Sequence, residues 1–178
     1  MSISFFPNSV EQVSEAPDQE IGWRQSSTTN MGYLLDSRWT TVSSLSHLAN
    51  PACGDLRNKT WALKCTGFQM NTLPDVITGL QLDLNGQRNG RIVDEVIQLT
   101  YLGNAIGSNN FEYVTDSEGH LKITNETQYG GSTDLWGTEL TPAMLQDPSF
   151  GVIIKFQSHP YYPHRCGITV DSVCLTVY

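Results

Sequence analysis

The sequence has few charged residues and especially few basic ones. Asp, Glu, Lys and Arg together make up 16% of its 178 residues, and 18 acidic against 10 basic side chains leave a formal net charge of -8. A protein that binds a nucleic-acid backbone needs Lys and Arg to replace the counterions of the phosphates. The composition therefore predicts that nucleic acid is not a partner.

Long hydrophobic runs are also absent. No apolar stretch reaches the roughly 20 residues that cross a bilayer as a helix. Residues 1–7 have neither the basic start nor the apolar core of a signal peptide. We therefore expect no membrane partner, and a chain that is made in a cytosol and stays soluble.

Cysteine is sparse and irregularly spaced. The four cysteines are Cys53, Cys65, Cys166 and Cys174. Their spacing matches neither a C-x-x-C metal knuckle nor a redox motif, so we expect no zinc, no other metal and no cofactor. Reduced thiols are the default without an export signal, although a particle that leaves the cell could oxidise them. Cys65 alternates with core candidates, whereas Cys174 alternates with Val173 and Leu175 and is our candidate for an intersubunit disulfide.

A recognisable catalytic constellation is missing as well. His47, His120, His159 and His164 lie far apart, except for the last two, which bound the loop 159–164. Two prolines predict that this loop is rigid and protrudes. No Gly-x-Ser-x-Gly nucleophile elbow is present. We predict that the protein is not an enzyme, and that the loop residues Tyr161 and Tyr162 are partner contacts.

The sequence does contain many short alternating segments separated by turn residues. Apolar and polar residues alternate in 60–68, 76–84, 91–102, 119–124, 150–156 and 168–178, which predicts strands. Asn85-Gly86 predicts a turn that ends the second of them. Thr141-Pro142 predicts a short helical turn, because it places a capping residue before a proline. These elements predict an all-β fold, an antiparallel two-sheet β-sandwich of jelly-roll type.

Residues 1–38 lack this alternation, although they carry large aromatic side chains. The segment from Ser9 to Pro17 predicts a single capped helical turn. Phe5, Phe6 and Trp23 must be buried somewhere to offset the entropy of ordering the segment, so we count them as partner contacts. We predict an N-terminal extension or anchoring arm at 1–38, before a sandwich domain at 39–178. The arm docks either on its own domain or on a neighbouring chain.

Three glycines and one carboxylate surround the only Leu-Trp pair of the sequence. We call residues 129–137 the glycine corner; its members are Tyr129, Gly130, Gly131, Ser132, Thr133, Asp134, Leu135, Trp136 and Gly137. Paired glycines reach positive φ angles at little cost, and an Asp can accept hydrogen bonds from the freed N–H groups. We interpret the segment as a structural turn that leads Trp136 into the core. A carbohydrate or metal site on Asp134 and Trp136 is the alternative, and it lacks further ligands nearby.

The glycine corner also resembles a known pattern. Tailed-bacteriophage virion proteins carry an aromatic-Gly-Gly-x-x-Asp-Leu-Trp-Gly signature, followed by a Thr-Pro turn, a Phe-Gly-Val strand and a last strand of the form Val-Asp-x-Val. The corresponding segments here are 129–137, 141–142, 150–152 and 170–173, and upstream 67–68, 74 and 77–80 are similar too. The resemblance covers residues 60–178 and is specific as an ordered set. It implies a noncatalytic virion component of the head-decoration, collar or tail-appendage type.

The expected function follows from this resemblance. The chain is expected in the virion, made in the bacterial host cytoplasm and attached in multiple copies, with other virion proteins and copies of itself as partners. The alternative is a glycan- or receptor-binding module of a phage tail or head fibre, because exposed Trp and Tyr stack on sugars. Trp61 and Trp136 are expected in the core, whereas Trp23, Tyr161 and Tyr162 remain candidates for contact with a host surface glycan.

Overall fold

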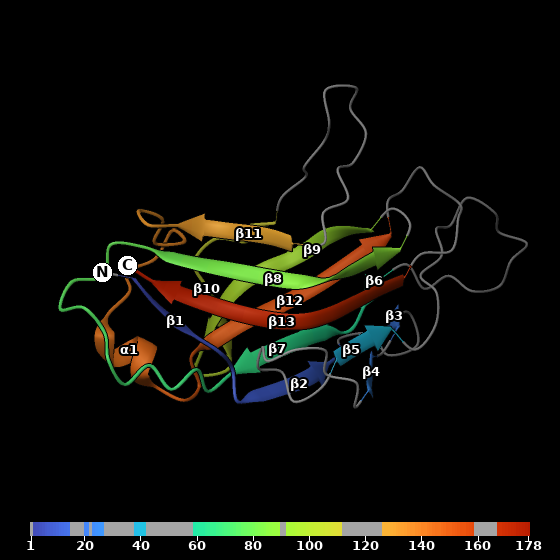
Figure 1. The fold of residues 1–178 in the computed structure, drawn as a ribbon, viewed down its shortest axis with the longest axis horizontal. Coiled ribbons are helices and arrows are strands. Elements are labelled where there is room, and N and C mark those ends of the chain that lie inside the picture. Colours follow the sequence, from blue (N-terminus) through green and yellow to red (C-terminus); the bar gives the residue numbers. More distant parts are fainter. Residues whose placement is uncertain are drawn as a thin grey trace, which may run out of the picture.

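The protein is a sandwich of two β-sheets (Figure 1), whose described strands pair antiparallel except for the parallel pair of β3 and β6. The computed structural model describes residues 2–14, 20–21, 23–26, 38–41, 59–89, 92–111, 126–158 and 167–178. Its one described helix, α1 (Pro142–Gln146), is only a short turn beside the sheets. Within the described ranges, no helix is long and apolar enough to span a membrane. The all-β, antiparallel two-sheet β-sandwich predicted from the alternating segments is therefore confirmed.

The described strands divide between the sheets as follows. The first sheet contains β1 (Ile3–Phe5), β4 (Trp23–Ser26), β5 (Arg38–Thr41), β8 (Leu80–Asn89), β11 (Glu126–Gly131) and β13 (Gly167–Val177). The second contains β2 (Ser9–Val13), β3 (Glu20–Ile21), β6 (Lys59–Thr60), β7 (Ala62–Thr66), β9 (Ile92–Tyr101), β10 (Asn104–Ile106) and β12 (Gly151–Ser158). In the first sheet β11, β8, β13, β5 and β4 lie side by side, and β1 also pairs with β13. In the second sheet β12 lies between β9 and both β6 and β7.

The core lies between the two sheets and comes from the apolar positions of the alternating strands. The first sheet contributes the buried side chains of Leu80, Leu82, Leu84, Val173, Leu175 and Val177. The second contributes those of Leu63, Cys65, Ile97, Leu99, Val152, Ile154 and Phe156. Burying an aliphatic or aromatic side chain of this size contributes about 1.5–3 kcal/mol relative to leaving it exposed. This period-two burial explains why the alternation in the sequence located the strands that form most of the core, β7, β8, β9, β12 and β13, and not the short strands nearer the margins.

The turn predicted at Asn85-Gly86 is wrong. β8 continues through these residues to Asn89, and β13 stays beside it with a shift of register between Val170 and Ser172. A Cβ on Gly86 would lie 2.0 Å from the carbonyl oxygen of Thr169. Gly86 is therefore required by the close approach of the bulged β13, and not by a hairpin turn.

Within the predicted strand 91–102, Glu95 interrupts the alternation of apolar and polar residues, and a second bulge explains this break. β12 pairs with β9 from Gly151 to Ser158, and the register shifts between Lys155 and Phe156, so that Lys155 lies opposite Val96 and Phe156 opposite Asp94. The extra residue in β9 is Glu95, which is why its side chain does not follow the period of its neighbours. Glu95 instead forms ion pairs with Lys59 and Lys155.

The predicted helical turn between Ser9 and Pro17 is also wrong. Residues 9–13 form the strand β2, which pairs antiparallel with β7 from Ser9↔Thr66 to Val13↔Ala62. Pairing with a neighbouring strand supplies hydrogen bonds that a single isolated turn cannot, so tertiary contact overrides the local capping pattern.

The described parts of 1–38 belong to both sheets of the sandwich. β1 pairs with the end of β13, with Phe5 opposite Leu175, and the side chain of Phe5 packs against the core. Phe6 is half-buried, and the backbone at Trp23 pairs with Thr41. The chain itself thus covers part of the apolar surface of Phe5, which is half-buried. The pairing does not test whether the segment anchors the protein to a partner, and that role stays a prediction.

Candidate functional site

The glycine corner turns the chain by means of three backbone positions with positive φ. They are Gly130 at φ 72°, Trp136 at 57° and Gly137 at 65°. A Cβ on Gly130 would lie 2.3 Å from the carbonyl oxygen of Leu80 and 2.5 Å from Nε1 of Trp136. Only glycine fits at position 130, because both the space and the φ angle exclude a side chain. Trp136 adopts a conformation that costs a bulky residue energy, so the surrounding contacts must hold it there.

Asp134 supplies several of those contacts. Its Oδ1 accepts a hydrogen bond from the backbone N–H of Trp136 at 2.7 Å, and its Oδ2 lies 3.4 Å from Nδ2 of Asn110. The backbone carbonyl of Asp134 accepts from the N–H of Leu80 at 2.9 Å, and its N–H donates to the carbonyl of Gly131 at 3.2 Å. The carboxylate thus caps the turn and links it to the segment after β10. Both of its oxygens are used inside the fold.

Trp136 is buried completely and bonded at both its ring and its backbone. Its indole Nε1 donates to the carbonyl of Leu80 at 2.8 Å, and its own carbonyl accepts from the N–H of Ser108 at 2.7 Å. The neighbouring Leu135 is exposed. Since a sugar-stacking ring needs an accessible face, the alternative of a carbohydrate site on Asp134 and Trp136 finds no accessible ring here.

Tyr129 carries a buried polar contact across the sandwich that the sequence did not indicate. Its hydroxyl donates to Oδ2 of Asp94 at 2.7 Å, and both residues are at most 2% exposed. Tyr129 comes from β11 in the first sheet, and Asp94 comes from the bulged part of β9 in the second. A hydrogen bond to a buried carboxylate is stronger than one between neutral groups, so it ties the two sheets at this point.

We expect Asp134→Ala to lower the free energy of unfolding by about 1–3 kcal/mol, because the N–H of Trp136 then loses its partner. Thermal and urea unfolding measure the change. Asp134→Asn is the matched control, since it keeps an oxygen that can accept the same bond and should retain most of the stability. Equal melting temperatures for the wild type and the alanine variant would contradict the capping role.

The two described cysteines differ in the way the sequence predicted. Cys65 is fully buried between the sheets, and burial raises the pKa of its thiol from 9.0 to about 12. Cys174 is half-buried on the outer face of β13, opposite Asp83. Burial first, and then the nearby charge of Asp83, raise the pKa of the Cys174 thiol. Both thiols are free, and the intersubunit disulfide of Cys174 stays a prediction; Cys53 and Cys166 lie outside the described residues.

The Cys65 thiol should make stability fall at high pH. Between pH 9 and about pH 12 the unfolded thiol loses its proton while the folded one keeps it, so the unfolded state binds fewer protons. Stability from this group is therefore complete below pH 9 and is lost as the pH rises towards 12. Urea unfolding from pH 8 to 10.5 measures the slope. Cys65→Val, which has no ionisable group, should unfold with a flatter pH dependence than the wild type, and identical slopes would contradict the expectation.

Most of the remaining predicted site residues lie outside the part of the chain that the structure describes. His47, His120, His159, His164, Tyr161 and Tyr162 are outside the described residues, as are the predicted strand at 119–124 and the side chain of Trp23. Trp61, expected in the core, is half-buried and packs against it. Among the described residues, no group of three or more His, Cys, Asp and Glu side chains lies close enough to hold a metal ion.

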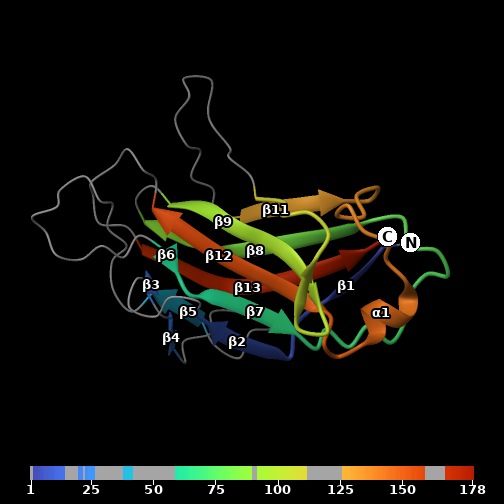
Figure 2. The same ribbon diagram turned by 180° about the vertical axis from the view of Figure 1, so that it is seen from behind.

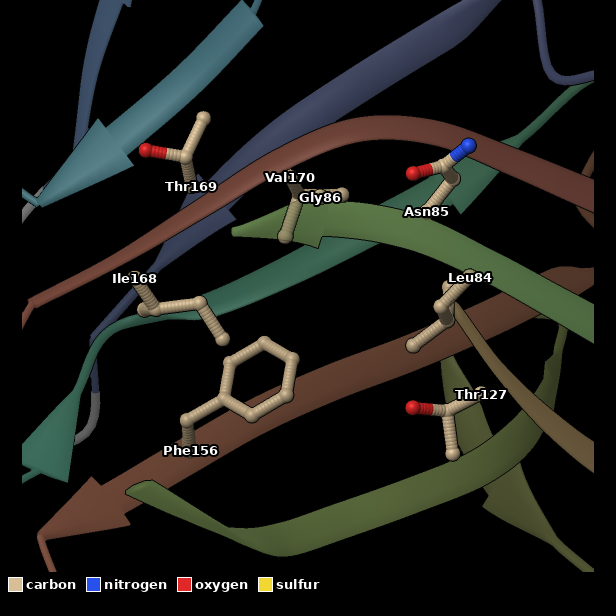
Figure 3. A pocket seen from close by; sticks show the side chains of 8 residues that line it. All are labelled: Leu84, Asn85, Gly86, Thr127, Phe156, Ile168, Thr169 and Val170. Carbon is tan, nitrogen blue, oxygen red and sulfur yellow. The ribbon is translucent and has the colours of Figure 1, made fainter. Parts of the chain in front are cut away.

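A small cavity lies beside the β13 bulge, between the two sheets (Figure 3). Its volume is about 20 Å³, and it is lined by Leu84, Asn85, Gly86, Thr127, Phe156, Ile168, Thr169 and Val170. The ring of Phe156 points between Ile168 and Leu84 (Figure 3). A space of this size holds about one water molecule. It is too small for a sugar or any other organic ligand.

Comparison with known proteins places this chain in no family. No protein-family model matches it, and no curated protein matches it. One of the solved structures it resembles is the CBM22-1 xylan-binding domain from Paenibacillus barcinonensis Xyn10C. The sequence identity is 10%, the TM-score is 0.33, and the alignment covers 98% of this chain and 92% of that one. A likeness this low identifies neither a ligand nor a function.

Proposed function

We propose that the chain is a noncatalytic structural component of a tailed-phage virion, an accessory protein of head-decoration, collar or tail-appendage type that is attached in multiple copies. The resemblance of residues 129–137 to the virion signature motivates the proposal. The observation that supports it most directly is that the polar groups of this signature form hydrogen bonds within the chain. Asp134 and the indole of Trp136 bond to the chain's own backbone, at Trp136 N–H and at the Leu80 carbonyl.

This arrangement supports a mechanical role for the signature. A site that binds a ligand or performs chemistry keeps polar groups available to it, whereas these groups hold the end of β11 against the start of β8. Contacts that fix a loop at three backbone segments make it rigid, and rigidity suits a protein that keeps its shape in a particle. Many copies on one particle make modest individual contacts sufficient for attachment.

Quantitative mass spectrometry of gradient-purified particles tests the proposal. The protein should copurify with the phage that encodes it, at a constant ratio to the major capsid protein, and should resist a salt wash that removes adventitious proteins. Trp136→Phe, introduced into the phage, keeps an aromatic ring but loses the hydrogen bond to the Leu80 carbonyl. It provides a variant in which the glycine corner is weakened and not removed. Absence of the wild-type protein from intact particles would overturn the proposal.

A glycan array on the purified protein separates the receptor-binding alternative from this proposal. A structural component should give no specific signal. Specific binding that is lost in Tyr161→Ala and Tyr162→Ala, while particle incorporation is retained, would favour the receptor-binding module. Trp136 is the wrong place to test such binding, because its ring is buried.

A further inference from the structure

The edge strands of the two sheets are protected from pairing with a further strand in different ways, and β11 differs from the others. At the margin of β9, the side-chain amide of Asn109 replaces a neighbouring strand: its Oδ1 accepts from the N–H of Ile97 at 2.8 Å and its Nδ2 donates to the carbonyl of Glu95 at 3.0 Å. The N–H of Asn110 then donates to the carbonyl of Ile97 at 2.8 Å. An added strand would have to displace these bonds.

Two other marginal strands carry a charged residue in their interior. Among the described strands, β2 pairs only with β7 and has Glu11 at its middle position. Likewise β4 pairs there only with β5, and it contains Arg24. Charges within an edge strand are a common protection against unwanted pairing, because two copies of the strand would bring like charges together.

β11 forms the opposite margin of the first sheet, beside β8 (Figures 1 and 2). Its sequence, Glu-Thr-Gln-Tyr-Gly-Gly, has no Lys and no Pro, and its only charged residue is Glu126 at the first position. Among the strands that the structure describes, β8 is the one that pairs with it. The usual protective devices are therefore missing from the interior of this edge.

The hydrogen bonds at Leu80 show which backbone groups of β11 face outward. Leu80 donates its N–H to Asp134 and accepts from Trp136 Nε1, both on the β11 side of β8. Backbone groups of a strand alternate in direction, so Leu82 and Leu84 also face β11, where they lie opposite Tyr129 and Thr127. The N–H and C=O groups of Glu126 and Gln128 consequently point away from β8, toward the margin.

The conformation of β11 is also fixed by contacts within the chain before a second strand pairs with it. The side chain of Gln128 donates to Oδ1 of Asp83 on β8 at 2.7 Å, and Asp83 accepts from Gln81 as well. The glycine corner fixes the other end of the strand through Asp134 and Trp136. A preorganised strand loses little conformational entropy when a second strand pairs with it.

We propose that β11 pairs antiparallel with β11 of a second copy of this chain, which joins the first sheets of two sandwiches across a two-fold axis. A second copy fits because each strand offers the same outward groups, and antiparallel pairing about Thr127 sets Glu126 of one copy opposite Gln128 of the other. The two Glu126 residues then lie at opposite ends of the pair, so like charges do not face each other. A two-fold axis is the commonest symmetry of homo-oligomers. The pairing is independent of the proposed virion role, since it concerns the isolated protein.

Sedimentation velocity of the purified full-length chain over a wide concentration range, under reducing conditions, tests the pairing. The wild type should form a dimer. Gln128→Pro removes the outward N–H and leaves the bonds of Thr127 and Tyr129 to β8, so it should weaken dimerisation by about 100-fold or more. Gln128→Ala is the matched control: it loses the same side chain but keeps the N–H, and should dimerise nearly as well as the wild type.

Hydrogen exchange of the wild type tests the same pairing without a variant, and so it decides the question if Gln128→Pro folds poorly. In the wild type, exchange of the peptide containing 126–131 should slow as the concentration rises through the dimerisation range, while that of 92–101 should not change. A wild type that stays monomeric at all concentrations would overturn the pairing. So would a folded Gln128→Pro variant that dimerises as tightly as the wild type.

Discussion

Replacing Trp136 by alanine should lower the free energy of unfolding by about 3–5 kcal/mol, the usual cost of truncating a buried aromatic side chain. The indole is fully buried, and its removal leaves both a cavity and a Leu80 carbonyl without its donor. A domain of this size is stable by only about 5–15 kcal/mol. The variant should therefore melt far below the wild type, by about 2–4 °C for each kcal/mol lost.

Two further variants separate the causes. Trp136→Phe fills most of the space but cannot donate to Leu80, so it should cost about 1–3 kcal/mol from the unsatisfied carbonyl together with a smaller cavity. Leu135→Ala changes the adjacent apolar residue of the same turn, which is exposed, and should cost about 0.5 kcal/mol or less. Similar losses for Leu135→Ala and Trp136→Ala would contradict the role of the indole as the centre of the corner.

The features that the sequence predicted well are those set by neighbours along the chain. Alternation predicted the burial of Leu80, Leu82 and Leu84, because the side chains of a strand point to opposite faces at a period of two. Thr141 was recognised as a helix cap for the same local reason, and its hydroxyl accepts from the N–H of Met144 at 3.2 Å. In the glycine corner, Gly130 and Asp134 could be interpreted from their own chemistry.

The features that the sequence did not predict depend on residues far apart in the chain. Gly86 looked like a turn residue beside Asn85, and only the approach of Thr169 shows that it serves a bulge. The strand β2 is not predicted because its partner β7 lies about fifty residues further along the chain, and the residues near β2 give no sign of this pairing. Glu95 did give a signal, since it broke the alternation of its strand, but a bulge could not be told from a strand end without β12.

The contact between Tyr129 and Asp94 is another feature that depends on residues far apart in the chain. It gives the second prediction with a large expected effect. Tyr129→Phe should lower the free energy of unfolding by about 1.5–3 kcal/mol, the range for a hydrogen bond to a charged group, because it removes the 2.7 Å bond to Asp94 and little volume. Urea unfolding at neutral pH measures the loss.

Tyr178→Phe is the matched control, because it makes the same chemical change at the surface. The Tyr178 hydroxyl donates to Oε1 of Gln81 at 3.2 Å in a partly exposed place, where water replaces a lost partner. This variant should cost at most about 1 kcal/mol. Tyr129→Phe should therefore lose more unfolding free energy than Tyr178→Phe, because its hydroxyl is buried and bonds to a carboxylate. Equal losses in the two variants would contradict the proposed strength of the contact between the sheets.

A double-mutant cycle isolates the pair itself. Asp94→Asn replaces the carboxylate by a neutral group, so Tyr129→Phe should cost less in that background than in the wild type, by about 0.5–3 kcal/mol. Such coupling would mean that the bond ties β11 of the first sheet to β9 of the second. Because the same strand carries the outward-facing groups of Gln128, Tyr129→Phe should also speed hydrogen exchange along 126–131 in the monomer. Additive losses with unchanged exchange would show instead that the Tyr129 hydroxyl contributes to stability independently of Asp94.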